Sequence, residues 1–232
     1  MVIPLVQKKS IYTTFLLVCF FYKPFNSVGQ SSDFIDLTST KFDKVTNIHL
    51  KTYEKKVDYS FSSFLFQVDF DSLEFKSIVY FNNVEFCSKV KFGRVIFNSY
   101  ASFSGANFDS LVYFDETHFC SISDFSSTLF NSNVYFSLVK FRSEVRFNNA
   151  EFNSVVNFSS SNFSTVVDFS GAIFNSKPNF NEVALPDTLI FENVVTRDEI
   201  DFTNCYFRVN RENEKGYKCK INLVNTDLWI FR

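Results

Sequence analysis

Phenylalanine recurs along most of this chain at a fixed interval. From Phe70 to Phe180 the gaps between successive phenylalanines alternate between five and six residues, so the pattern repeats every eleven residues. Two residues before most of these phenylalanines stands a smaller apolar residue, such as Val79 before Phe81, and the residue between the two is usually polar. Alternation of apolar and polar side chains with a period of two predicts short strands that bury one face.

An unbroken repeat of this kind predicts a stacked solenoid, in which each unit buries its apolar face only against its neighbours. If each half-repeat forms one face, a coil takes two repeats, or 22 residues. Residues i and i+22 then lie one above the other, about 4.8 Å apart. The inward phenylalanines stack, and each buried ring contributes about 4 to 6 kcal/mol before conformational entropy is counted. The sequence therefore predicts an all-β fold stabilised by aromatic ladders.

A hydroxyl residue marks the corners of the predicted coil. It stands two positions after the phenylalanine of one half-repeat, at Ser77, Ser88, Ser99, Ser110, Ser121, Ser132, Ser143, Ser154, Thr165 and Ser176. We expect these hydroxyls to hydrogen-bond the neighbouring backbone and to hold tight corners. The functional alternative is a flat hydroxyl array that meets a carbohydrate or ice surface.

The repeat unit of small apolar, polar, Phe, polar, polar resembles the pentapeptide-repeat family in its Phe-centred variety. Residues 149–153 (NAEFN) and 105–109 (GANFD) match the family pattern closely, and the match is clean from about Phe64 to Phe180. The sixth residue of alternate units departs from the strict five-residue repeat. The resemblance implies a right-handed quadrilateral β-helix, a β-solenoid with four short faces per coil and inward central residues.

The chain divides into four predicted segments. Residues 1–29 have the pattern of an export signal, because Lys8 and Lys9 precede the apolar stretch Ile11 to Tyr22. That stretch is shorter than the roughly 20 residues that span a bilayer core, and the alternative for it is a buried N-terminal strand. We expect an N-terminal cap at 30–41, the solenoid at 42–207 and a C-terminal cap at 208–232 that covers open strand edges.

The charge of the chain argues against a nucleic-acid or anionic-membrane partner. The sequence has 23 basic and 25 acidic residues and a net charge of −2. Removal of residues 1–29 takes away Lys8, Lys9 and Lys23 and no acid, which leaves 20 basic against 25 acidic residues, a net charge of −5. Basic residues form no cluster, so the positive patch typical of nucleic-acid binders is missing.

Four cysteines follow the predicted signal. Cys87 and Cys120 have the same place in the repeat and lie 33 residues apart, one and a half coils, so we expect free surface thiols. Cys205 and Cys219 flank the beginning of the C-terminal segment. They are either bridged in a cap, as export permits, or Cys205 is a small core residue.

The sequence lacks the residue clusters that catalysis requires. The acids are scattered through the repeat, and His49 and His118 stand apart, so we interpret His118 as a solvated surface residue rather than a base or metal ligand. No Gly-rich phosphate loop, nucleophile elbow, HExxH or paired CxxC occurs. We therefore expect no enzymatic activity, no cofactor and no metal site.

Outward residues 22 positions apart form rows along the predicted solenoid. Lys91, Tyr113 and Tyr135 make an aromatic stripe with a cation at one end, and Asn157 and Asn179 continue it. Tyrosine offers both ring area and a hydroxyl, so Lys91, Tyr113, Tyr135 and Asn157 are the candidate partner-binding face. The alternative is that the tyrosines only cover strand backbone.

A second row, Asp124, Arg146 and Asp168, alternates in charge along the predicted solenoid.

These observations predict an exported, non-catalytic repeat scaffold in the bacterial periplasm, at the cell surface or outside the cell. It binds an unknown protein or glycan through its outer faces, has no integral membrane span, and can associate end to end as a homodimer. The alternative, implied by the family resemblance, is a DNA-mimicking inhibitor of a topoisomerase such as DNA gyrase. That function calls for a strongly acidic cytoplasmic rod, whereas the mature charge here is only mildly negative.

Overall fold

The fold is built from short parallel strands. The computed structural model describes residues 34–48, 51–198, 200, 202, 204–207 and 220–224, with the backbone alone at 46, 47, 207 and 220–224. All regular elements in these residues are strands, most of them two residues long, so the expected all-β class is confirmed. The predicted export signal, His49 and Cys219 lie outside the described residues.

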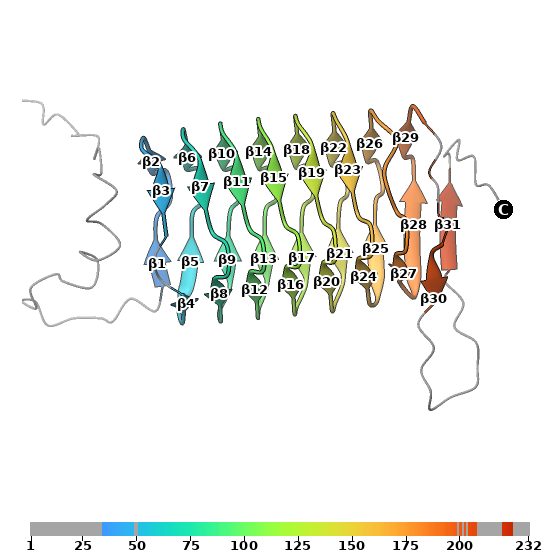
Figure 1. Ribbon diagram of the computed structural model, residues 1–232, viewed down its shortest axis with the longest axis horizontal. Helices are drawn as coiled ribbons and strands as arrows, with labels where there is room; N and C mark the ends of the chain where they lie inside the picture. The colour runs from blue at the N-terminus through green and yellow to red at the C-terminus, as the bar shows by residue number, and fades with distance from the viewer. Residues whose placement is uncertain are drawn as a thin grey trace, which may run out of the picture.

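Four parallel sheets form the four faces of a β-solenoid (Figure 1). Face A consists of β1 (Phe34–Asp36), β5 (Lys56–Asp58), β9 (Val79–Tyr80), β13 (Ala101–Ser102), β17 (Ser123–Asp124), β21 (Val145–Arg146), β25 (Val166–Asp168), β28 (Thr188–Glu192) and β31 (Lys220–Val224). Face B consists of β2 (Lys41–Phe42), β6 (Ser63–Phe64), β10 (Glu85–Phe86), β14 (Asn107–Phe108), β18 (Leu129–Phe130), β22 (Glu151–Phe152), β26 (Ile173–Phe174) and β29 (Val195–Thr196). Face C consists of β3 (Thr46–Asn47), β7 (Val68–Asp69), β11 (Val90–Lys91), β15 (Val112–Tyr113), β19 (Val134–Tyr135) and β23 (Val156–Asn157). Face D consists of β4 (Thr52–Tyr53), β8 (Glu74–Phe75), β12 (Ile96–Phe97), β16 (His118–Phe119), β20 (Lys140–Phe141), β24 (Asn162–Phe163), β27 (Ala184–Leu185) and β30 (Tyr206–Phe207).

The strand register confirms the predicted coil length. Val79 pairs with Ala101 on face A, and Val90 pairs with Val112 on face C, each 22 residues further along the chain. The same offset holds from β1, which pairs with β5 as Phe34 to Lys56. Stacked coils therefore begin inside the segment 30–41 that the sequence suggested as a cap.

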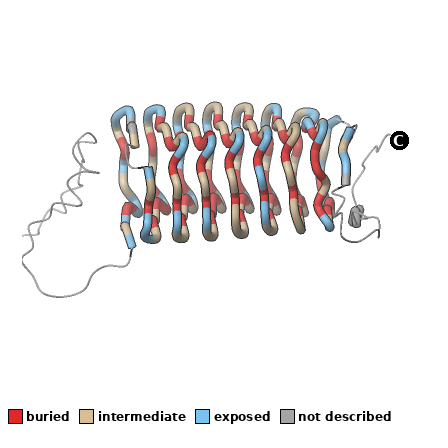
Figure 2. Tube along the Cα trace, turned by 60° about the horizontal axis from the view of Figure 1, so that its bottom comes forward, coloured by how far each residue is buried: buried red, intermediate tan, exposed pale blue. Residues whose placement is uncertain are grey.

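Aromatic ladders fill the interior. The inward phenylalanines of the central coils are fully buried, and Figure 2 shows buried segments repeating at the same places in successive coils. Phe103 stacks on Phe125 with ring centroids 4.9 Å apart and planes 3° apart, while Phe103 and Phe114 meet edge to face at 5.3 Å. Stacking within a ladder and edge contacts between ladders are both favourable aromatic geometries.

Left-handed backbone recurs at the corner of every six-residue unit. From Phe70 to Leu73, for example, the Leu73 N–H donates to the Phe70 carbonyl, and Ser72 between them has φ of 61°. A positive φ at the third residue of a β-turn is what type II turns require. Residues with positive φ are Ser39, Phe61, Ser72, Asn83, Arg94, Gly105, Glu116, Ser127, Leu138, Asn149, Ser160, Gly171, Glu182, Asn193 and Asn204.

The expected role of the corner serines is wrong. Among the described residues, one of these ten hydroxyls makes a hydrogen bond, from Ser154 Oγ to Asn133 Oδ1 of the preceding coil at 2.6 Å. The local bonds instead come from the outward residue just before the phenylalanine, where Asp124 Oδ1 accepts from the Ser126 N–H at 2.9 Å and Asp168 Oδ1 from the Ser170 N–H at 2.8 Å. Such Asx turns hold the corner from its other side.

Inward hydroxyls are satisfied by the neighbouring coil. Thr128 Oγ1 donates to the Phe103 carbonyl at 2.9 Å and Ser62 Oγ to the Leu37 carbonyl at 2.7 Å, each 25 residues back. Cys205 Sγ donates to the Phe180 carbonyl at 3.0 Å and packs against the core. The small core role, one of the two alternatives for Cys205, is the one that this contact supports.

Two tyrosines replace phenylalanine in the core near its N-terminal end. Tyr53 and Tyr59 are 2% and 1% exposed, and neither hydroxyl has a hydrogen-bond partner among the described residues. Burial raises the pKa of Tyr53 to about 12 and that of Tyr59 well above its ordinary value. These hydroxyls are polar groups that the aromatic core leaves unsatisfied.

Face A resumes its pairing after a longer connection near the C-terminus. Thr188 pairs with Lys220, and Glu192 pairs with Val224, so the offset is 32 residues instead of 22. The pairing still extends over five residues of β28 and β31. The predicted C-terminal cap segment thus adds a strand to the solenoid.

Candidate functional site

The predicted aromatic stripe lies along face C. Lys91, Tyr113, Tyr135 and Asn157 stand opposite one another on the successive strands β11, β15, β19 and β23, and an isolated bridge continues the row to Asn179. Each of the first four is partly exposed. The structure therefore brings the four candidate residues together, while their role in binding stays a prediction.

The two tyrosines of the stripe stack on each other. Their ring centroids are 4.9 Å apart and their planes 9° apart, and Lys89 Nζ lies 4.8 Å from the centroid of the Tyr113 ring. At one end Lys91 forms an ion pair with Asp69 at 3.3 Å. Because the rings stack along the solenoid axis, the stripe presents ring edges and hydroxyl groups outward more than ring faces.

The charged row on face A is in register but pairs differently from its expected alternation. Arg146 lies between Asp124 and Asp168 on neighbouring strands. Its Nε, however, donates to Glu144 Oε1 at 2.5 Å, two residues away on its own coil. Hydrogen bonding to Glu144 raises the pKa of Arg146 further. This row is therefore internally neutralised and offers little free charge.

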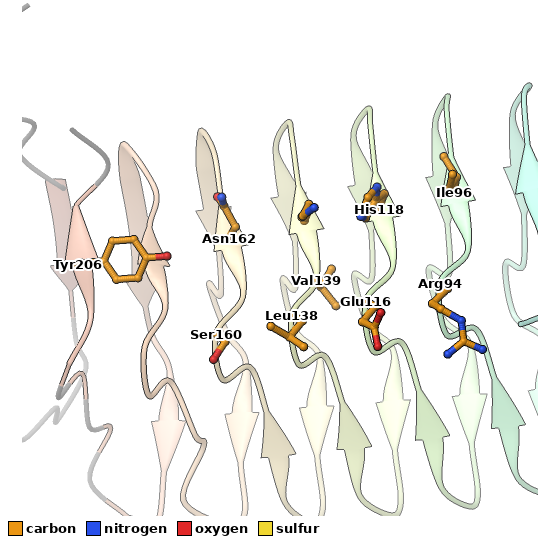
Figure 3. Close-up of a pocket in the computed structure, with 10 residues that line it drawn as sticks. Arg94, Ile96, Glu116, His118, Leu138, Val139, Ser160, Asn162 and Tyr206 are labelled. Carbon is orange, nitrogen blue, oxygen red and sulfur yellow. The ribbon is translucent and has the colours of Figure 1, made fainter. Parts of the chain in front are cut away.

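A groove of about 580 Å³ runs along face D beside the corner that joins it to face C. Two parallel rows of side chains border it (Figure 3). The corner row is Arg94, Glu116, Leu138 and Ser160, and the strand row is Ile96, His118, Lys140 and Asn162. Val139 is buried between the rows, and Tyr206 lies at the C-terminal end of the strand row. Both rows follow the 22-residue period, so the groove runs along the solenoid axis.

Positive charge in the groove is concentrated at Lys140. Arg94 is held by Asp71 at 3.7 Å and donates to Ser72 Oγ at 3.3 Å. Lys140, and Arg142 two residues further on, are exposed and form no ion pair with any described residue. These two are the uncompensated cations on this side of the solenoid.

His118 lies in this groove and is partly exposed rather than fully solvated. Partial burial, followed by the positive charges of Lys140 and Arg142, lowers the pKa of His118. A lowered pKa favours the neutral imidazole at neutral pH. The side chain therefore adds hydrogen-bonding capacity to the groove and no charge.

The sequence analysis took His118 singly and did not find the groove. The signal that could have found it is the combination of two rows, one at 94, 116, 138 and 160 and one at 96, 118, 140 and 162, which mix charged and apolar outward residues. Within the described residues, no group of three or more His, Cys, Asp or Glu could hold a metal ion, and no helix is long and apolar enough to cross a membrane. Cys87 and Cys120 are free thiols, exposed and partly exposed respectively, as expected.

The comparisons with known proteins give few matches. No family model matches the sequence, and no curated protein matches it. Among solved structures the chain is similar to QnrB1, titled a plasmid-mediated fluoroquinolone resistance protein, in two trypsin-treated variants. The first is 19% identical over 77% of this chain and 92% of that chain with a TM-score of 0.28. The second is 19% identical over 75% and 90% with a TM-score of 0.28.

A likeness at that score carries no argument, so the fold rests on the strand pairing itself. The 22-residue register, the four faces and the inward phenylalanines are those that the resemblance to Phe-centred pentapeptide repeats implies.

Proposed function

We propose that this chain is a non-catalytic scaffold that binds a partner protein through its outer faces, with the stripe on face C and the groove on face D as contact surfaces. The observation that carries the proposal is the filling of the interior by stacked phenylalanine rings, which leaves the outside as the surface for recognition. Small-molecule sites need a concave apolar cavity, whereas a protein partner needs an extended surface with aromatic anchors.

The experiment is capture of partners by the tagged full chain, compared with two matched double variants. Tyr113→Ser with Tyr135→Ser removes the stacked pair on face C. Tyr80→Ser with Tyr100→Ser removes a second outward aromatic pair, whose rings meet edge to face at 6.0 Å beside face A. We expect the first variant to lose a specific partner that the second retains. A partner held equally by both variants removes the stripe from consideration.

We also propose that the scaffold is exported, with residues 1–29 removed. The support is the order of a charged start, an apolar stretch of twelve residues and small residues at Ser27 and Gly29. Mass spectrometry of the mature chain tests this directly, because export predicts a first residue of Gln30. An intact N-terminus in a cytosolic chain contradicts export.

The second candidate function is a DNA-mimicking inhibitor of a topoisomerase such as DNA gyrase. It is the function to which the resistance named in the QnrB1 title relates. The observation that favours it is an uneven charge: residues 111–198 carry ten acidic and five basic residues, whereas residues 34–110 carry nine of each. Supercoiling by gyrase in the presence of the purified chain tests it. Inhibition that is weakened by Glu151→Gln with Asp168→Asn supports mimicry, and undiminished supercoiling at excess chain contradicts it.

A further inference from the structure

We propose that the groove on face D binds an extended acidic segment of a partner protein, with a carboxylate side chain against Lys140 and an apolar side chain against Leu138. The proposal rests on the protein-binding function above and names the site and the chemistry of the partner.

The charge of the groove selects an acidic occupant. Lys140 and Arg142 have no ion-pair partner among the described residues, whereas Lys91, Arg94 and Arg146 are all paired with carboxylates. Glu116 lies further along the corner row, beside His118, and repels a second negative charge there. Complementary charge sets register and partner choice, so the carboxylate of the occupant belongs at the Lys140 end.

Leu138 is placed in a way that folding does not explain. It has φ of 59° and is 53% exposed. A left-handed backbone is unfavourable for leucine by about 1 to 2 kcal/mol, and an exposed leucine gains nothing from burial. The equivalent corner positions of the neighbouring coils hold Glu116 and Ser160. Contact with an apolar side chain of a partner gives this leucine a role.

Asn162 supplies an acceptor that no described residue uses. Its Oδ1 is buried and lacks a hydrogen-bond donor, and a buried polar atom without a partner costs about 1 to 3 kcal/mol. An extended peptide that runs between the two rows carries a backbone N–H at each residue. One of these can donate to Asn162 Oδ1, which favours a peptide over an anion that has acceptors only.

Fluorescence polarisation of labelled peptides on the full chain tests the proposal. The probes are a short peptide of alternating glutamate and valine and a matched peptide of alternating lysine and valine. We expect the acidic peptide alone to bind, with affinity that falls as salt is raised. Lys140→Glu with Arg142→Glu should weaken binding about tenfold or more, because two attractions become repulsions. Lys41→Glu with Lys51→Glu, at two exposed lysines outside the groove, is the control with the same change of charge.

A second variant separates binding from folding. Leu138→Asn removes the apolar contact and places at this left-handed position a residue that tolerates it, so it should weaken peptide binding without lowering the midpoint of thermal unfolding. Equal binding of the acidic peptide by the groove variant and its control overturns the proposal. So does equal binding of a short labelled DNA duplex, which would indicate general attraction of anions.

The capture experiment distinguishes this inference from the proposed function. A partner that the groove variant retains and the Tyr113 and Tyr135 variant loses leaves the scaffold function standing and rules out the groove. Loss of every specific partner from the wild-type chain removes the function itself.

Discussion

Replacement of Phe125 by serine should destabilise the solenoid more than any comparable change on its surface. The Phe125 ring is fully buried in the middle of the array. It stacks on Phe103 at 4.9 Å and on Phe147 at 5.1 Å, and it meets three further rings edge to face or nearly so: Phe114, Phe119 and Phe136. The substitution removes all five aromatic contacts at once.

The expected loss follows from two contributions. Truncation of a buried phenylalanine costs about 3 to 5 kcal/mol through lost burial and the cavity left behind. A serine hydroxyl in that cavity adds about 1 to 3 kcal/mol if it finds no partner. The free energy of unfolding should therefore fall by about 4 kcal/mol or more. Since domains of this size are stable by only about 5 to 15 kcal/mol, much of the total is at stake.

Urea denaturation followed by circular dichroism measures this loss, with Phe61→Ser as the matched control. Phe61 is 66% exposed and has φ of 61°, so the same change there should cost almost nothing. Phe64→Ser, nearer the N-terminal end, should cost less than Phe125→Ser because fewer coils depend on it. A loss below about 2 kcal/mol for Phe125→Ser, or equal losses at Phe125 and Phe61, would refute a core held by stacked rings.

Two further predictions concern the buried tyrosines and one corner. Tyr59→Phe should raise the free energy of unfolding by about 1 kcal/mol, because it removes a buried hydroxyl without a partner; a clear loss in thermal or urea denaturation would show that the hydroxyl is satisfied. Above pH 10 the unfolded chain loses tyrosine protons that folded Tyr53, with a pKa of about 12, retains, so stability should fall with rising pH by up to about 1.4 kcal/mol per pH unit per tyrosine. The Tyr53→Phe and Tyr59→Phe double variant should lessen that fall, and an unchanged pH profile counts against the assignment. Gly105→Ala should cost about 1 to 2 kcal/mol, because Gly105 has φ of 68° and an added Cβ lies 2.5 Å from Asn83 Oδ1; Ala106→Gly is the neighbouring control for backbone entropy alone, and full stability of Gly105→Ala would mean that the corner relaxes.

The phenylalanine spacing was sufficient to predict the architecture. An inward side chain every five or six residues closes a coil of 22 residues, and strand pairing between coils then places Tyr113 beside Tyr135 without any further information. The corner hydrogen bonds could not be predicted in the same way. They depend on residues 22 to 25 positions away in the neighbouring coil, as between Thr128 and Phe103, and on which side of a turn a side chain projects.

The groove escaped prediction for a related reason. Leu138 and Lys140 are ordinary outward residues in the linear sequence. They border one surface because a corner residue with positive φ turns its side chain toward the next face. A repeat therefore predicts which residues lie inside more readily than which outward residues meet across a corner.

The ten additional residues between β30 and β31 show that the solenoid measures its coils by pairing and not by chain length. Face A closes again after an insertion nearly half a coil long, and β31 pairs with β28 over five residues. The D-to-A corner is thus a natural point of grafting. A foreign loop or a whole folded domain inserted at the equivalent corner of an inner coil, for example after Ser143, would be carried on a rigid rod at an axial position that the designer can choose in steps of about 4.8 Å.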